Sequence, residues 1–201
     1  MDGSKRRGGL LLAILLVLSV PTTACAHSAI EGLEGFGGGL LHPLTSPAHL
    51  LVITSLGLLT GQRKPLDLKT LFAVFAPCLA LALLLTMTGT ITSVYQPLLV
   101  VLALCAATAV ALEMPVPLMA SRALFAAAAF AIGFDSGPEK GSAAVVIKTL
   151  VGTWLMVIFL LFDVAYYTSL ATRSHWPKVG VRIVGSWIIA ISLLILALSL
   201  I

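Results

Sequence analysis

Long apolar runs dominate this chain, and short segments between them carry most of the charged residues. A helix that crosses a bilayer core needs about 20 predominantly apolar residues. On that criterion the pattern predicts six spans, at about 36–60, 70–88, 95–112, 117–134, 142–170 and 181–201. Because the loops between them are short, consecutive spans should be antiparallel neighbours. The pattern therefore predicts an all-α integral membrane protein with one transmembrane helical domain over residues 27–201.

The first residues of the chain form a separate unit. A basic segment is followed by an apolar stretch from Leu10 to Val20 and then by Ala24-Cys25-Ala26. This is the arrangement of a cleaved secretory signal peptide, so we assign residues 1–26 to a leader and expect the mature chain to begin at His27. Two alternatives stay open: lipidation of Cys25 after cleavage before it, or retention of the segment as an anchor. The residues before Cys25 fit a lipid-attachment motif poorly.

Composition and charge support this class and give an orientation. The chain is 59% hydrophobic and 10% charged, with a mean hydropathy of +1.10. Basic residues concentrate in alternate loops, which the positive-inside rule places in the cytoplasm, and a cleaved leader places the mature N-terminus outside. We therefore expect a multi-pass protein of a bacterial inner membrane. The basic residues that set this orientation are Arg63, Lys64, Lys69, Arg122, Arg173, Lys178 and Arg182.

Several classes of function are excluded. No basic surface with interleaved aromatic residues points to nucleic acid. No nucleophile with a neighbouring base, phosphate-binding loop or pair of general acid and base stands out, so we do not expect an enzyme. The expected partners are the lipid bilayer and whatever the polar residues within the spans can bind.

The most informative polar residues break the first span, where His42-Pro43 and Pro47 lie before His49. In hydrocarbon, a broken helix with imidazoles is tolerated where it is buried in protein or lines a cavity. Ser46 before Pro47 predicts a new helix start, with the proline at its first position. On an unbroken helix the two histidines would lie about 10 Å apart along the axis. The break is therefore what allows both imidazoles to approach one ion.

These residues carry a resemblance to a known family. Gly35-Phe36, then His42-Pro43-Leu44-Thr45, then His49-Leu50-Leu51 resembles the first signature of the HupE/UreJ family, which reads H-P-x-x-G-x-D-H. The resemblance implies a small membrane protein with a leader and about six spans. It also implies a role as a nickel or cobalt permease, or as an accessory protein for hydrogenase or urease. It covers the whole mature chain in layout, and its specificity depends mainly on this motif.

The chain departs from both signatures of that family. Ser46 and Ala48 replace the glycine and the aspartate of the first. The second, F-H-G-x-A-H-G-x-E, aligns with residues 131–139, where Ile132 and Ser136 replace both histidines and Glu139 remains. Transition metals favour imidazole with help from carboxylate, so these losses should weaken a nickel site or change the ion it accepts.

Two hypotheses about function follow. The first is a permease or metal-handling protein for a divalent transition metal of the nickel and cobalt class, with an outward-facing His/carboxylate site. The ion would be transported or sensed, and no cofactor would be bound permanently. The second is a non-transporting membrane partner in the assembly of a metalloenzyme, which keeps the fold and has lost the metal site.

The candidate ligands come from two sources. The resemblance implies His42, His49 and Glu139. Asp135 is an additional acid in the second signature, and we expect it to compensate for the histidines lost there. His27, as the first mature residue, would combine its α-amine and imidazole into a two-nitrogen chelate, with a disordered terminus as the alternative.

Three charged residues within or beside the spans also need partners. For Arg122 and Asp163 we expect an interhelical ion pair, with Asp163 as an inner-gate ligand or proton acceptor as the alternative. For Lys148 we expect an ammonium that reaches outward to Glu139 or Asp135. A second hypothesis gives Lys148 the electrostatic role of the missing ion.

Overall fold

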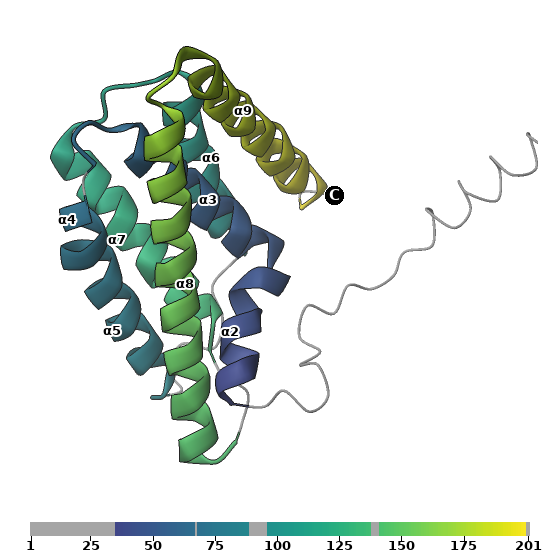
Figure 1. The fold of residues 1–201 in the computed structure, drawn as a ribbon. Helices are drawn as coiled ribbons and strands as arrows, with labels where there is room; N and C mark the ends of the chain where they lie inside the picture. Colours follow the sequence, from purple (N-terminus) through teal and green to yellow (C-terminus); the bar gives the residue numbers. More distant parts are fainter. Residues whose placement is uncertain (1–34, 67, 89–95, 138–140, 200–201) are drawn as a thin grey trace, which may run out of the picture.

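Helices form all the regular secondary structure in the described residues of the computed structural model, which are 35–66, 68–88, 96–137 and 141–199. Those helices form a bundle (Figure 1). The helices are α2 (Phe36–Thr45), α3 (Pro47–Gln62), α4 (Leu68–Thr70), η1 (Leu71–Phe75), α5 (Ala76–Thr86), α6 (Gln96–Ala111), α7 (Leu118–Asp135), α8 (Ala143–Ala171) and α9 (His175–Leu198). The predicted all-α membrane fold is confirmed. The leader, with Cys25 and His27, lies outside the described residues.

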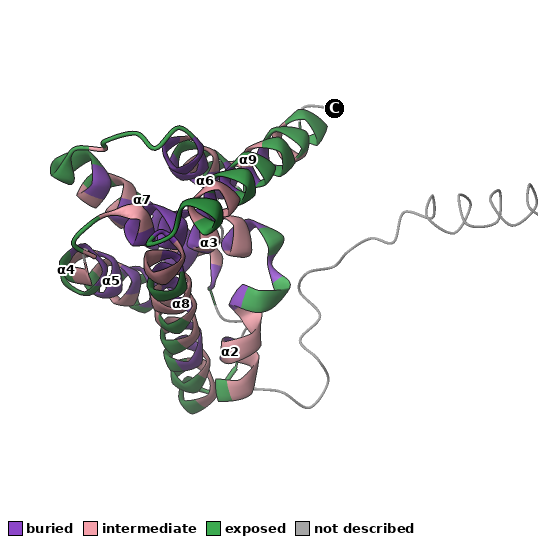
Figure 2. Ribbon diagram, turned by 45° about the horizontal axis from the view of Figure 1, so that its top comes forward, coloured by how far each residue is buried: buried purple, intermediate pink, exposed green. Residues whose placement is uncertain are grey.

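The centre of the bundle is α3, most of whose residues are buried (Figure 2). It packs against α8 on one side and α6 on the other, while α5 packs against α7. α9 packs mainly against α6, and its C-terminal end points away from α8 (Figure 1). A helix that is apolar on all faces is expected in the interior of a bundle, and α3 lies there.

Threonines of α8 hold the broken span in place. Thr149 donates a hydrogen bond to the carbonyl of Gly35 at 3.1 Å, and Thr153 donates to the carbonyl of Gly39 at 3.1 Å. A Cβ built on Gly39 would overlap the backbone oxygen of Thr149. Small residues let helix backbones approach this closely in membranes, so α2 lies directly against α8.

The helices follow the predicted spans with two differences. Four are long and apolar enough to cross a membrane, and the bent pair α2 and α3 brings the number to five. α6 has only 16 residues, and residues 89–95 before it lie outside the described part. The second difference is α9, which begins at His175 and not near residue 181. Pro177 stands in its first turn, where a missing N–H leaves no hydrogen bond unmade, so the helix includes Lys178 and Arg182.

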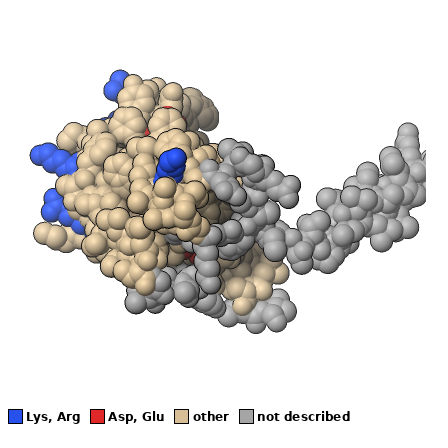
Figure 3. Space-filling view, turned by 90° about the horizontal axis from the view of Figure 1, so that it is seen from below, with Lys and Arg blue, Asp and Glu red and all other residues tan. Residues whose placement is uncertain are grey.

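Polar side chains donate hydrogen bonds to backbone carbonyls where α3, α6 and α8 end, at the upper end of the bundle in Figure 1. The last carbonyls of a helix have no partner within it, and cationic side chains suit them. The bonds from Gln62 to Val110 O at 3.1 Å and from Arg182 to Ala111 O at 3.0 Å act at the end of α6, and the bond from Lys64 to Thr172 O at 3.1 Å acts at the end of α8. Arg63 donates to Val116 O at 3.0 Å, in the connection before α7. The described surface seen from below is mostly uncharged (Figure 3).

Candidate metal site

The break between α2 and α3 is an elbow of 78° at Ser46. Ser46 is extended, with φ −93° and ψ 109°, as expected for a residue before proline. Pro47 occupies the first turn of α3, and the Ser46 side chain makes no capping hydrogen bond. The predicted helix start is therefore at the expected residue, although the hydroxyl does not cap it.

The elbow brings together the two histidines that the sequence singled out. Their ring centroids lie 5.2 Å apart, with the ring planes inclined at 70°. His42 belongs to the last turn of α2 and His49 to the first turn of α3. The approach of the two rings that the proline break predicts is confirmed.

Asp135, the last residue of α7, reaches the same place from another helix. Its Oδ2 lies 3.0 Å from Nε2 of His49, whose side chain is fully buried, while the Asp135 side chain is 16% exposed. The distance is that of an ion pair, but the angles do not make a hydrogen bond at Nε2. An acid on α7 thus stands next to His49, where Ala48 provides none on α3.

His49 keeps a polar atom in the interior without a partner. Its Nδ1 is buried and takes part in no hydrogen bond. Buried polar groups are nearly always hydrogen-bonded, and an unsatisfied one costs about 1–3 kcal/mol. Yet within the described ranges no group of three or more His, Cys, Asp or Glu side chains is arranged to hold a metal ion. His27 and Glu139 lie outside those ranges, so their predicted part in the site stays a prediction.

The positions that hold histidine in the second family signature are part of the packed interior. Ile132 is fully buried among core residues, and Ser136 is 3% exposed. The Ser136 hydroxyl donates to the carbonyl of Ile132 at 2.7 Å, one turn earlier on α7. Neither side chain offers a ligand. Asp135 is the residue of this turn that does.

The expected pair of Arg122 and Asp163 is not formed. Among the described residues, the side chains within ion-pair distance are His49 with Asp135, and Glu113 with Lys178 and Arg182. The expectation was wrong because α7 packs mainly against α5, whereas α8 packs mainly against α2 and α3. Equal depth in the membrane does not make two helices neighbours. Nε of Arg122 is buried without a hydrogen bond, and Asp163 is partly buried.

Lys148 is exposed on α8, beside Gly35 at the start of α2. It is not within ion-pair distance of Asp135, which faces His49 instead. This corrects the expectation that Lys148 reaches Asp135. Its other expected partner, Glu139, lies outside the described residues.

Sequence reasoning missed Glu113, the charged centre at the other end of the bundle. It has φ 50°, the left-handed region that favours glycine. The N–H of Glu113 donates to Val110 O at 3.2 Å and the N–H of Met114 to Ala109 O at 2.9 Å, which together end α6 in a Schellman motif. Its carboxylate lies 2.7 Å from Nζ of Lys178. No glycine marks this helix end in the sequence, so the usual signal was missing.

Comparison with known proteins agrees with the resemblance in the first motif. Nothing among curated proteins and nothing among solved structures matches the chain significantly. The family model described as HupE / UreJ protein matches residues 15–195, which is most of the chain. The chain therefore belongs to the HupE/UreJ family, a group of membrane proteins related to nickel and cobalt.

Proposed function

We propose that this protein is a permease or metal-handling protein for a divalent transition metal ion of the nickel and cobalt class. The ion would enter at the elbow between α2 and α3, where the ring of His42 and the carboxylate of Asp135 each lie next to His49. Two imidazoles with one carboxylate form a donor set that suits nickel, cobalt, copper and zinc. The choice of nickel or cobalt among these ions comes from the family to which the chain belongs.

The observation that carries the proposal is the state of His49. A fully buried imidazole with one nitrogen unpartnered and the other facing a carboxylate is costly as a packing residue. The same arrangement suits a metal ligand in its ion-free state. A carboxylate beside one ring nitrogen orients the imidazole and raises the basicity of the other nitrogen, which can then bind the ion. An ion held at Nε2 instead would have the carboxylate of Asp135 beside it as a second ligand.

The orientation belongs to the same proposal. The upper end of the bundle holds the connections after α3, α6 and α8, and the positive-inside rule assigns the basic residues within or next to these connections to the cytoplasm. Asp135 is at the opposite end of α7 from that side. The elbow would then receive ions from outside, and His27 and Glu139 are available in the sequence to add ligands there.

The test compares metal accumulation in cells that lack their own nickel uptake. We expect the variant with both His42→Ala and His49→Ala to accumulate nickel and cobalt at background level. Asp135→Asn, which keeps the size and removes the charge, should reduce accumulation at least about tenfold, because one charged contact worth about 1.5–3 kcal/mol is lost. His175→Ala is the matched control, since His175 is exposed at the start of α9. Equal accumulation by all four proteins would refute the permease.

A second candidate is the non-transporting assembly partner. It is supported by the burial of Ile132 and by the hydroxyl of Ser136, which donates its hydrogen bond within α7. Two positions that hold histidine in the family motif are therefore occupied by residues of the packed interior. In that case the histidine variants would leave metal accumulation unchanged. Deleting the protein would lower the activity of a nickel or cobalt enzyme in the same cell.

A further inference from the structure

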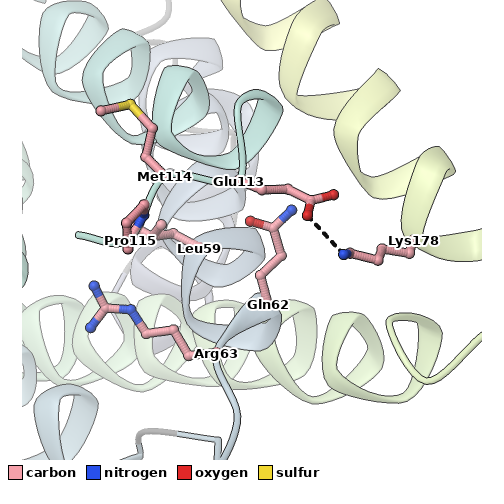
Figure 4. A pocket seen from close by; sticks show the side chains of 7 residues that line it. All are labelled: Leu59, Gln62, Arg63, Glu113, Met114, Pro115 and Lys178. Carbon is pink, nitrogen blue, oxygen red and sulfur yellow. Dashed lines mark ion pairs between the residues drawn. The ribbon is translucent and has the colours of Figure 1, made fainter. Parts of the chain in front are cut away.

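A cavity of about 240 Å³ lies at the basic end of the bundle, at the other end of α3 from the elbow. α3 contributes Gln62 and Arg63, the connection after α6 contributes Glu113 and Met114, and α9 contributes Lys178. Lys178 and Arg63 reach it from different sides (Figure 4). Nothing in the proposed metal pathway uses these residues.

The charges of the cavity favour an anion. Arg63 and Lys178 are two cations, and Glu113 is the one acid of the lining. That acid is already neutralised, since Nζ of Lys178 lies 2.7 Å away and Nη1 of Arg182 lies 3.5 Å away. Arg63 commits one guanidinium nitrogen to Val116 O, and the rest of its planar fork is available to a phosphate. With Arg182 at the edge, the net charge around the cavity is positive.

The surroundings of the cavity are apolar and exposed. Leu112 is 64% exposed and Met114 is 52% exposed, directly beside Glu113. Trp176, two residues before Lys178, is 83% exposed. Exposed tryptophan and aliphatic side chains around a basic cluster are typical of the boundary between headgroups and acyl chains.

We propose that this cavity binds the phosphate of an anionic phospholipid from the cytoplasmic leaflet. Arg63 and Lys178 would hold the phosphodiester, and Leu112 and Met114 would contact the first carbons of the lipid. Basic pockets between helices on the cytoplasmic side are suited to anionic headgroups. The strained backbone of Glu113 fits this role, because it places the carboxylate where it fixes Lys178 at the cavity.

A free phosphate could satisfy the same cations, and the apolar rim is what favours a lipid. The two sources differ in what they need from Met114. The affinity for a soluble phosphate does not depend on an apolar contact at the rim. A lipid places its glycerol and acyl carbons against Met114, so its affinity does depend on that contact. The experiment therefore includes both kinds of ligand.

The test measures lipid retained by the purified full-length protein, by native mass spectrometry, after exchange into mixed micelles of phosphatidylglycerol and phosphatidylcholine. We expect the wild type to retain phosphatidylglycerol selectively. The double variant Arg63→Gln/Lys178→Gln should retain it at least about tenfold less, since two charge-assisted contacts are lost. Lys69→Gln/Arg173→Gln removes the same charge at exposed sites outside the cavity and should retain the lipid as the wild type does.

Further variants keep the result decisive if the double variant is unstable. Arg63→Lys/Lys178→Arg keeps both charges and should restore retention. Met114→Glu leaves every cation in place and should expel the lipid by repulsion. The proposal is overturned if phosphatidylglycerol is not preferred, if both double Gln variants lose lipid equally, or if Met114→Glu retains it. It is also overturned if inorganic phosphate at millimolar concentration displaces the lipid completely.

Discussion

Gly39→Ala should destabilise the protein, because α2 and α8 touch at that residue through their backbones. The added methyl group would overlap the carbonyl oxygen of Thr149, which cannot rotate away. α2 must therefore shift, and the hydrogen bond that Thr153 donates to Gly39 O at 3.1 Å lengthens with it. Overpacking of this kind costs about 1–3 kcal/mol, and the lost hydrogen bond about 1 kcal/mol.

The higher helix propensity of alanine offsets about 0.5–1 kcal/mol of that cost. The net loss is then about 2 kcal/mol, which for a domain of this size lowers the melting temperature by about 4–8 °C. Gly180→Ala is the matched control, since a Cβ built there meets nothing within 4 Å. It should leave the melting temperature unchanged or raise it.

The assay is thermal unfolding of both variants in detergent, followed by fluorescence-detected size exclusion after heating. An equal melting temperature for Gly39→Ala and the wild type would refute the close contact between α2 and α8. A fall of the same size in Gly180→Ala would show that any alanine at a glycine destabilises this bundle.

Three more substitutions test single contacts in the same assay. Thr153→Val should lower stability by about 1 kcal/mol through the unsatisfied Gly39 carbonyl, while Thr153→Ser should not; equal melting of the two would count against the bond. Trp154→Phe removes the indole bond to a carbonyl of α5 at 2.9 Å and should cost about 1 kcal/mol, and an unchanged melting temperature would contradict this bond's contribution. The hydrogen bond from Lys178 holds the pKa of Glu113 below its ordinary 4.5, so the stability it contributes is complete above that pH and is lost as the pH falls through the lowered pKa. Glu113→Gln should remove that part of the acid dependence, and an unchanged melting profile over about pH 3–6 would contradict it.

The sequence was sufficient to predict the helices and the elbow. Apolar runs of the length of a bilayer core predict helices with little ambiguity, and a proline after Ser46 cannot continue the helix before it. The approach of His42 to His49 follows from that break alone. Local chemistry determined these features, so local sequence was enough to predict them.

Contacts between helices could not be predicted in the same way. Depth in the membrane can be counted along the chain, but it does not tell which helices are neighbours. This is why the expected pair of Arg122 and Asp163 was wrong, and why Asp135 was expected near Lys148 although it lies next to His49. Glu113 was not predicted for another reason. It has a left-handed backbone conformation, which glutamate rarely adopts.

The threonine bonds from α8 restrict how the elbow can move. Thr149 and Thr153 hold α2 at Gly35 and Gly39, and the hydroxyl of Thr172 lies 3.4 Å from the carbonyl of Gly61 near the end of α3. Because α2 and the end of α3 are both bonded to α8 and its C-cap residue Thr172, neither α2 nor α3 can tilt freely about the elbow. Any change in the bend would displace Ser46 sideways relative to α8. Spectroscopic probes on α8 and at the two ends of the broken span should therefore keep their separations when nickel or cobalt ions are added.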